Sequence, residues 1–368
     1  MQTTVYSADK IFTGTSWLTD VAIVVQDKKV HSIVPLSSLN ENIEVKKFTN
    51  SFIAPAFIDI QLYGAYKRLL SAYPDVETLS AINEYSRAGG ACISLPTVAT
   101  NTKDVFYKCI DAVRDYWKQG GEGIYGLHLE GPWINKEKRG AHLESLIHSP
   151  TEDEVKEILE YGKGVIKIIT LAPEVCSDEV IKLIQSYNVI ISAGHTNATY
   201  QEAMAAFDNG INTVTHLYNA MSPLQHRAPG VVGATMLHEK VRASIIADGY
   251  HVDFAAIKLA KAMMKERLFV ITDAVTETAI EPYKHELNGD KYECAGTLSG
   301  SALNMHRSFT NLVNKAGIEV EEALRMCSLY PAEVLGCDEL YGKIAPGFSA
   351  QLLVINKEHL TMESLITL

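Results

Sequence analysis

The periodicity of hydrophobic and polar residues changes twice along the chain. Near its start, short β-branched stretches such as 21–25 and 30–34 are separated by polar turns, which is typical of small β-strands. Stretches of the same kind return between 342 and 355. We therefore expect residues 1–52 and 341–368 to form one small, β-sandwich-like domain from both termini.

Between these ends, compact apolar runs alternate with amphipathic stretches of helical period, a pattern typical of parallel βα units. Eight runs are expected to be strands: 52–60, 91–98, 124–129, 165–171, 189–193, 213–216, 243–247 and 268–272. Helices are expected at 76–88, 104–119, 152–161 and 254–266, with another at 320–335 after the eighth strand. This succession predicts an α/β fold, a (β/α)8 barrel of the TIM type over residues 53–340. Residues 219–240 are rich in Pro and Gly and predict a long loop with room for one short helix.

Composition narrows the class of protein. The 368 residues are 47% hydrophobic and 21% charged, as in a globular protein with a sizeable core. The net charge of -11 argues against nucleic acid or an anionic membrane as the main partner. No signal-peptide pattern and no membrane-length apolar run is present, and the six cysteines form no C-x-x-C pair. We expect a soluble cytoplasmic protein with reduced thiols.

Chemistry-bearing residues follow the predicted strands. In β/α barrels the active site forms at the carboxyl ends of the strands. Glu130 follows the third run, His195 the fifth, His216 lies at the end of the sixth, and Asp273 follows the eighth. Each residue alone is more typical of packing or capping, but together one carboxylate and two imidazoles suit a divalent metal with an open position for water. Glu130, His195 and His216 are therefore the predicted ligands.

Three further residues have predicted roles near this metal. Asp273 is expected to take a proton from water and return it to a leaving amine, although it could instead cap a helix. His251, after the seventh strand, could hydrogen-bond a carbonyl oxygen. Arg227 lies in the loop after strand six, where it could bind a phosphate or carboxylate or be an ordinary surface residue. His128 alternates with Glu130, and its expected role is structural.

Several sequence blocks then resemble a known family. They are Leu-Glu-Gly-Pro at 129–132, Gly-His-Thr-Asn-Ala-Thr at 194–199, Thr-His-Leu-Tyr-Asn-Ala-Met at 215–221, Ile-Ala-Asp-Gly-Tyr-His-Val-Asp at 246–253, Thr-Asp-Ala at 272–274 and Leu-Ser-Gly-Ser at 298–301. In this order, from about residue 55 to 335, they resemble the N-acetylglucosamine-6-phosphate deacetylases of the amidohydrolase superfamily.

The resemblance implies a ligand set, a base and a substrate site. It implies metal at Glu130, His195 and His216, and Asp273 as general base and then acid. The implied substrate-binding residues are Gln61, Ala141, His142, Asn219, Ala220, Arg227, His251 and the 298–300 turn, which comprises Leu298, Ser299 and Gly300. It also implies a homodimer, and leaves open whether Arg227 serves its own site or its neighbour's.

Many amidohydrolases carry His-x-His after the first strand, whereas this chain has Gln61-Leu62-Tyr63. Because a glutamine amide is a poor ligand, we expect one divalent metal per chain. Zinc is favoured, and iron, manganese or cobalt would also fit the ligand set.

The predicted function is metal-dependent hydrolysis of N-acetylglucosamine 6-phosphate to glucosamine 6-phosphate and acetate. One alternative is a related barrel amidohydrolase acting on a cyclic amide or nucleobase, which a substrate screen would distinguish. Another is a non-catalytic, barrel-shaped assembly protein, which metal analysis would distinguish.

Overall fold

The computed structural model describes residues 3–367, and these fall into two compact units. The first contains the described parts of Met1–Ile58, Ser86–Cys92 and Met305–Leu368. The second contains Asp59–Tyr85 and Ile93–Asn304. A small sheet built from both termini is thus separate from the eight parallel strands, as expected, and the expected boundaries at 52/53 and 340/341 stay a prediction.

The terminal sheet has seven strands, in the order β20-β19-β5-β1-β3-β4, with β2 paired to β1. Its strands are β1 (Thr3–Phe12), β2 (Trp17–Leu18), β3 (Val21–Gln26), β4 (Lys29–Pro35), β5 (Val45–Pro55), β19 (Leu352–Asn356) and β20 (Met362–Ile366). The amide of Val30 also donates to the carbonyl of Phe348, so the start of β4 bonds to the segment that leads into β19. The result is one sheet curled around its own core, in place of two separately bonded layers.

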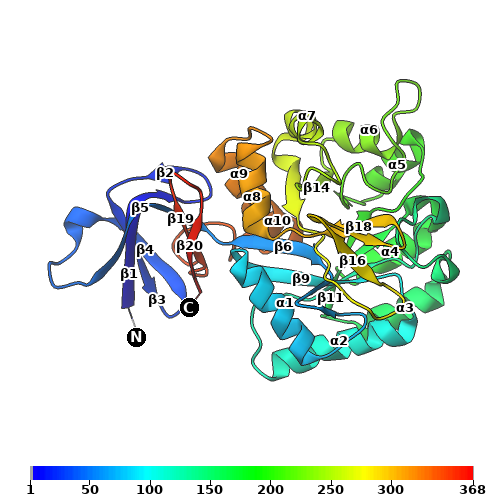
Figure 1. Ribbon diagram of the computed structural model, residues 1–368, viewed down its shortest axis with the longest axis horizontal. Coiled ribbons are helices and arrows are strands. Elements are labelled where there is room, and N and C mark those ends of the chain that lie inside the picture. Colours follow the sequence, from blue (N-terminus) through cyan, green and yellow to red (C-terminus); the bar gives the residue numbers. More distant parts are fainter. Residues whose placement is uncertain (1–2, 368) are drawn as a thin grey trace. The chain divides into compact units, whose positions relative to one another are not determined.

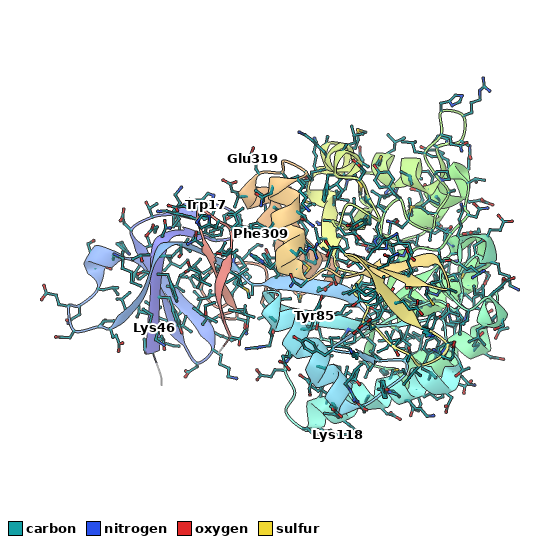
Figure 2. All side chains as sticks on the ribbon, in the orientation of Figure 1. Trp17, Lys46, Tyr85, Lys118, Phe309 and Glu319 are labelled. Atoms are coloured by element: carbon teal, nitrogen blue, oxygen red, sulfur yellow. The ribbon has the colours of Figure 1, made fainter. Side chains whose placement is uncertain are left out.

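Aromatic packing helps to hold this first unit together. Trp17 (Figure 2) lies edge-on to Phe52 at 5.2 Å between ring centroids, and its indole donates to Glu321 at 2.8 Å. Phe309, also labelled there, packs on Phe57 at 5.7 Å. Helical residues from the C-terminal third therefore pack with residues from the first sixty.

Eight parallel strands form the barrel, and each pairs with the next one along the chain (Figure 1). They are β6 (Phe57–Leu62), β9 (Ala91–Ala99), β10 (Leu127–Glu130), β11 (Ile166–Leu171), β12 (Ile190–Ala193), β13 (Thr213–Val214), β14 (Arg242–Ile246) and β15 (Leu268–Ile271). The first and last strands meet just beyond β15, where the amide of Asp273 donates to the carbonyl of Gln61 at 2.9 Å and the amide of Tyr63 donates to that of Ala274 at 2.8 Å. The predicted barrel is confirmed and is nearly closed.

Several helices begin after a residue whose side chain accepts a free amide. The helices are α1 (Val76–Ala88), α2 (Lys103–Lys118), α3 (Glu152–Tyr161), α4 (Asp178–Ser186), α5 (Tyr200–Asp208), α6 (Gly230–Leu237), α7 (Phe254–Met264), α8 (Met305–Asn314), α9 (Val320–Cys327) and α10 (Leu329–Leu335). Thr102, Thr151, Ser177 and Asp253 each cap the following helix, and Thr199 forms a capping box with Glu202 at α5. None of the helices within residues 3–367 is long and apolar enough to cross a membrane.

Two predicted elements were wrong in extent. The run 52–60 divides between β5 and β6, because the backbone changes partners there: the amide of Ala56 bonds to Gln351, and that of Phe57 to Gly90. The helix expected at 320–335 breaks at Ser328 into α9 and α10. Pro331 accounts for the break, because its ring would clash with the carbonyl four residues earlier in a continuous helix. The short helix foreseen within 219–240 is present as α6.

The sequence patterns missed one sheet altogether. Between β15 and α8, strands β16 (His285–Asn288), β17 (Lys291–Cys294) and β18 (Thr297–Ser301) form a three-stranded antiparallel sheet, gold in Figure 1. The segment 298–300, expected to be a turn, lies in β18. A short ribbon of β7 (Gly64–Ala65) and β8 (Arg68–Leu69) follows β6. The single-turn helices are Leu36–Ser38, Lys136–Lys138, Glu144–Leu146, Pro173–Val175 and Lys265–Arg267.

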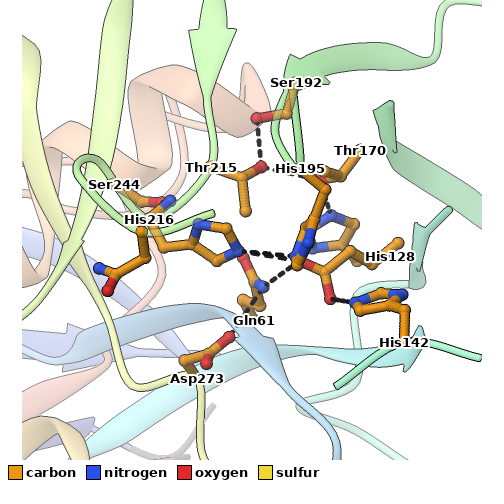
Figure 3. Close-up of polar contacts among 12 residues, drawn as sticks. Gln61, His128, His142, Thr170, Ser192, His195, Thr215, His216, Ser244 and Asp273 are labelled. Atoms are coloured by element: carbon orange, nitrogen blue, oxygen red, sulfur yellow. Dashed lines mark hydrogen bonds and ion pairs between the residues drawn. The ribbon is translucent and has the colours of Figure 1, made fainter. Parts of the chain in front are cut away.

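The barrel interior contains a layer of hydrogen-bonded polar side chains (Figure 3). The hydroxyl of Thr215 lies 2.7 Å from that of Thr170 and 2.6 Å from that of Ser192. His128 bonds Thr170 at 2.7 Å, and burial lowers its pKa to about 4, which agrees with its expected structural role. Asp59 accepts from the hydroxyl of Thr272 at 2.5 Å.

Replacing Asp59 tests the cost of burying an acid in this layer. Burial raises the pKa of Asp59 from 3.8 to about 7. Because the unfolded chain releases this proton near pH 4, the stability contributed by Asp59 is present below pH 4 and is lost as the pH rises through 7. Asp59→Asn replaces the carboxyl group with an uncharged amide, whose oxygen can still accept from Thr272. We expect the variant to gain roughly 4 kcal/mol relative to wild type between pH 4 and pH 8.

Urea unfolding of the two metal-free proteins at several pH values measures this difference. A difference that does not change with pH would show that Asp59 titrates normally.

Candidate metal and catalytic site

The predicted site residues converge on one cavity of about 320 Å³ at the carboxyl ends of the strands. Its lining contains almost every one of them: Glu130, Ala141, His142, His195, His216, Asn219, Ala220, His251, Asp273, Leu298, Ser299 and Gly300. Gln61 is buried against this group and contacts its carboxylates. Arg227 does not line the cavity and is exposed on its loop.

Glu130, His195 and His216 form a compact set of possible ligands, and Figure 3 labels the two histidines. Oε1 of Glu130 lies 3.2 Å from Nε2 of each histidine, and the two Nε2 atoms are 3.1 Å apart. Ligands at 2.0–2.1 Å from a tetrahedral zinc are separated by about 3.3 Å. The three atoms therefore match one face of a tetrahedral metal site.

A neighbouring carbonyl holds His195 in a ligating state. Nδ1 of His195 donates to the carbonyl of Lys138 at 2.8 Å, which leaves a lone pair on Nε2. The amide of His216 donates to Ser244 at 2.8 Å. His195, His216 and Asp273 all have left-handed backbones, with φ of 49°, 37° and 55°. Backbone strain of this kind is frequent at functional sites. Here each of the three residues lies just beyond the end of a barrel strand, where the left-handed conformation changes the direction of its side chain. The residues present fit a divalent metal.

The carboxylate of Glu130 carries the central negative charge of the site. Burial alone would raise its pKa, but His195, His142 and His216 hold the pKa well below its usual range. Nε2 of His142 lies 3.2 Å from Oε2 of Glu130, and its Nδ1 lies 2.7 Å from the hydroxyl of Thr100. Burial lowers the pKa of His142 to about 4, so at neutral pH it is an uncharged partner of Glu130.

Gln61 and Tyr63 lie at the end of the first barrel strand, where many amidohydrolases carry His-x-His. The amide of Gln61 lies 3.1 Å from Oε1 of Glu130 and 2.9 Å from Oδ1 of Asp273. The hydroxyl of Tyr63 donates to Oε2 of Glu130 and lies 3.2 Å from Oδ1 of Asp273. Burial raises the pKa of Tyr63 well above its usual value, so the hydroxyl stays a donor. Sequence reasoning did not include Tyr63, although its spacing of two from Gln61 at a strand end was a usable signal.

Asp273 is a carboxylate outside the three-ligand group. Burial and the charge of Glu130 raise its pKa, while His216, His251 and His195 oppose the shift. A buried carboxylate with a raised pKa is a better proton acceptor than an exposed one, as a general base requires.

His251 is oriented by Asp248. Its Nδ1 donates to Oδ2 of Asp248 at 2.5 Å, and Oδ1 accepts the amides of Tyr250 and His251 at 2.8 Å each. Burial opposes ionisation of Asp248, but the hydrogen bonds and charge of His251 keep its pKa low. Because Nδ1 is engaged with Asp248, Nε2 is the nitrogen of His251 that can hydrogen-bond a ligand in the cavity.

Comparisons with known proteins agree with this geometry. The amidohydrolase family matches residues 52–367, and the NagA composite domain matches residues 8–48. The chain is 30% identical to the N-acetylglucosamine-6-phosphate deacetylase of Haemophilus influenzae, over 95% of this chain and 94% of that protein. It is also 30% identical to the N-acetylgalactosamine-6-phosphate deacetylase of Escherichia coli O157:H7, over 96% and 95%.

Solved structures are similar over the whole chain. The N-acetylglucosamine-6-phosphate deacetylase of Pasteurella multocida has a TM-score of 0.93 at 32% identity, with 100% of this chain and 98% of that chain covered. A mutant of the Mycobacterium smegmatis enzyme in complex with N-acetyl-D-glucosamine-6-phosphate has a TM-score of 0.91 at 26% identity, with the same coverage.

The ligand set predicts the metal content of the protein. We expect about one tightly held divalent metal per chain, because the described residues contain one group of three possible ligands and Gln61 replaces a ligating histidine. Glu130→Gln should lose most of that metal, since it removes the only anionic ligand of the three. Glu144→Gln, a change at an exposed glutamate, should keep it.

Elemental analysis after dialysis measures both variants. Close to two equivalents in the wild type, or full retention by Glu130→Gln, would contradict the assignment.

Proposed function

We propose, because this chain belongs to the amidohydrolase family, that it hydrolyses the acetyl amide of N-acetylglucosamine 6-phosphate to glucosamine 6-phosphate and acetate. One observation carries the proposal: a three-ligand metal group and a separate buried carboxylate, Asp273, line the same cavity. The names of relatives aligned over nearly the full chain support the choice of substrate.

Glu130, His195 and His216 would hold one divalent metal, for which zinc is our choice and iron, manganese or cobalt are compatible. When bound, such a metal supplies Lewis acidity toward an amide carbonyl and lowers the pKa of water. Tyr63 donates to Oε2 of Glu130, the oxygen that does not lie beside His195 and His216, so that oxygen is already engaged and disfavours a second metal.

Asp273 moves the proton. Its carboxylate accepts the proton of the attacking water and then donates it to the amine nitrogen, which is too poor a leaving group to depart as an anion. The amide of Gln61 fixes Oδ1 of Asp273 at 2.9 Å and so orients the carboxylate.

His251 stabilises the negative charge that develops on the carbonyl oxygen. Its Nδ1 is held by Asp248, so Nε2 is the nitrogen that can face that oxygen. In the imidazolium form both ring nitrogens carry a proton, and Nε2 then donates a hydrogen bond to the oxygen.

Arg227 binds the 6-phosphate from a second copy of the chain. Its side chain is exposed and does not line the cavity of its own chain, although it follows the strand that ends in the ligand His216. A homodimer in which the loop around Arg227 reaches the neighbouring site would bring the guanidinium to the phosphate. No disulfide joins the six cysteines, which all lie within residues 3–367, and this suits a reducing cytoplasm.

N-acetylgalactosamine 6-phosphate is a second candidate substrate. The Escherichia coli relative named for that sugar is as similar to this chain as the Haemophilus influenzae relative. The two sugars differ only in the configuration at C4, so the same metal, base and phosphate site would serve both.

Acetate release from N-acetylglucosamine 6-phosphate, before and after chelation, tests the proposed function. We expect turnover that chelation abolishes and added metal restores. No release from either 6-phosphate sugar by metal-loaded protein would refute it, and turnover of a cyclic amide or nucleobase would favour the rival enzyme class.

Asp273→Asn keeps the shape of the side chain and removes the base. We expect kcat to fall at least ~10²-fold, in line with general acid–base contributions, while metal content stays normal. Asp115→Asn, on the exposed face of α2, is the matched control and should be unaffected. Turnover near the wild-type rate in Asp273→Asn would place proton transfer elsewhere.

Arg227→Ala should weaken kcat/KM for the 6-phosphate sugar about 10- to 150-fold, since a charge-assisted bond is worth roughly 1.5–3 kcal/mol. Activity on unphosphorylated N-acetylglucosamine should barely change. An equal loss on both substrates, or no loss, would exclude Arg227 as the phosphate ligand.

Mixed dimers distinguish an Arg227 that serves the site of its own chain from one that serves the site of the neighbouring chain. In a dimer of one Arg227→Ala chain and one Asp273→Asn chain, a site with an intact Asp273 receives Arg227 from its neighbour. We expect remixing the two variants to restore about a quarter of wild-type activity, from statistical pairing. Activity that stays at the average of the two variants would mean that Arg227 does not act across the dimer.

A further inference from the structure

We propose that His285 is a specificity-determining residue that hydrogen-bonds a hydroxyl of the sugar ring. His285 begins β16, is 5% exposed, and lines the cavity that contains Glu130 and Asp273. It lies in the gold three-stranded sheet of Figure 1, outside the sequence blocks that carry the metal and the base.

The imidazole of His285 is held firmly. Its Nδ1 lies 2.9 Å from the hydroxyl of Ser299 on β18, another cavity-lining residue. The ring of Tyr283 is parallel to it within 9° at 6.3 Å between centroids, and the hydroxyl of Tyr283 donates to the carbonyl of Thr100 at 2.6 Å. Ser299 is therefore a positioning residue, and Nε2 is the nitrogen of His285 that remains available to the cavity.

The charge state of His285 indicates the class of ligand. Burial lowers its pKa to about 4, so the imidazole is neutral at neutral pH. In one tautomer Nε2 donates, and in the other it accepts. A hydroxyl can pair with either, because it both donates and accepts, whereas an anionic phosphate is better matched by a charged donor.

The choice of hydroxyl rests on the proposed function. With the C2 amide at the metal group and the C6 phosphate at Arg227, the ring has hydroxyls at C1, C3 and C4 left for other contacts. The C4 hydroxyl is the one whose configuration separates the two candidate sugars. A fixed hydrogen-bonding group on a separate sheet can distinguish them without any change in the metal or the base.

Combining a substitution at His285 with deoxy analogues of the substrate tests the proposal. His285→Phe keeps an aromatic ring beside Tyr283 and removes Nε2. We expect kcat/KM for N-acetylglucosamine 6-phosphate to fall about 2- to 12-fold, the effect of one neutral hydrogen bond. The same comparison is made with the 1-, 3- and 4-deoxy analogues of the sugar. One of these lacks the hydroxyl that His285 contacts, and for that analogue alone the substitution should leave kcat/KM unchanged. The same fold-loss on the parent sugar and on all three analogues would overturn the proposal.

Companion variants separate recognition from folding. His285→Gln, which places an amide near the former Nε2, should recover part of the loss, and Ser299→Thr should retain what Ser299→Ala loses. Metal content should stay near wild type in all of them, and His359→Ala, at an exposed histidine, should behave as wild type. If wild-type protein releases no acetate from either sugar, the proposed function fails and this inference falls with it. If wild-type protein is active but His285→Phe lowers kcat/KM by the same factor for the parent sugar and all three analogues, only the inference is overturned.

Discussion

The buried charge of Glu130 is the constraint on which the rest of the site depends. A carboxylate inside a barrel costs several kcal/mol unless every lone pair is matched. Here Oε1 is surrounded by His195, His216 and the amide of Gln61, while Oε2 receives Tyr63 and lies beside His142. Nδ1 of His195 donates to the carbonyl of Lys138, so its Nε2 carries a lone pair 3.1 Å from Nε2 of His216, and a cation between these two nitrogens and Oε1 would satisfy all three. The same requirement explains why strained backbone at both histidines is tolerated.

Closure of the barrel and placement of the proposed base depend on one group of hydrogen bonds. The amide of Asp273 bonds to the carbonyl of Gln61, and the side chain of Gln61 returns to Oδ1 of Asp273. The carboxylate is therefore tethered by the side chain of a residue whose backbone also forms the seam between β6 and β15. A general base gains from this rigidity, because proton transfer requires the acceptor within hydrogen-bond reach of the water that it activates.

Much of the fold and the centre of the site could be predicted from sequence. Parallel strands are continuous apolar runs, and their carboxyl ends must meet at one rim, so Glu130, His195 and His216 could be grouped before any coordinates. The run 52–60 was misjudged because an apolar stretch does not show where it changes from one sheet to another. Tyr63 and His285 were missed for a related reason: their roles depend on which groups face them in the fold. The strands that begin at His285 are short and largely polar, so no periodic signal marks them.

The electrostatics of the cavity explain why substrate recognition must extend beyond the strand ends. Its lining includes the carboxylates of Glu130, Glu137 and Asp273, with Lys138 as the one lysine or arginine among the described lining residues. A metal would offset part of this negative charge beside the amide, but a phosphate several bonds away would still meet an acidic surface. A phosphorylated sugar would therefore gain from a further cation in addition to Lys138. In the proposed homodimer, Arg227 supplies this cation from the neighbouring chain, since its side chain is exposed and does not line the cavity of its own chain. On these proposals the strand ends carry the reaction, while the loop and the β16–β18 sheet select the substrate.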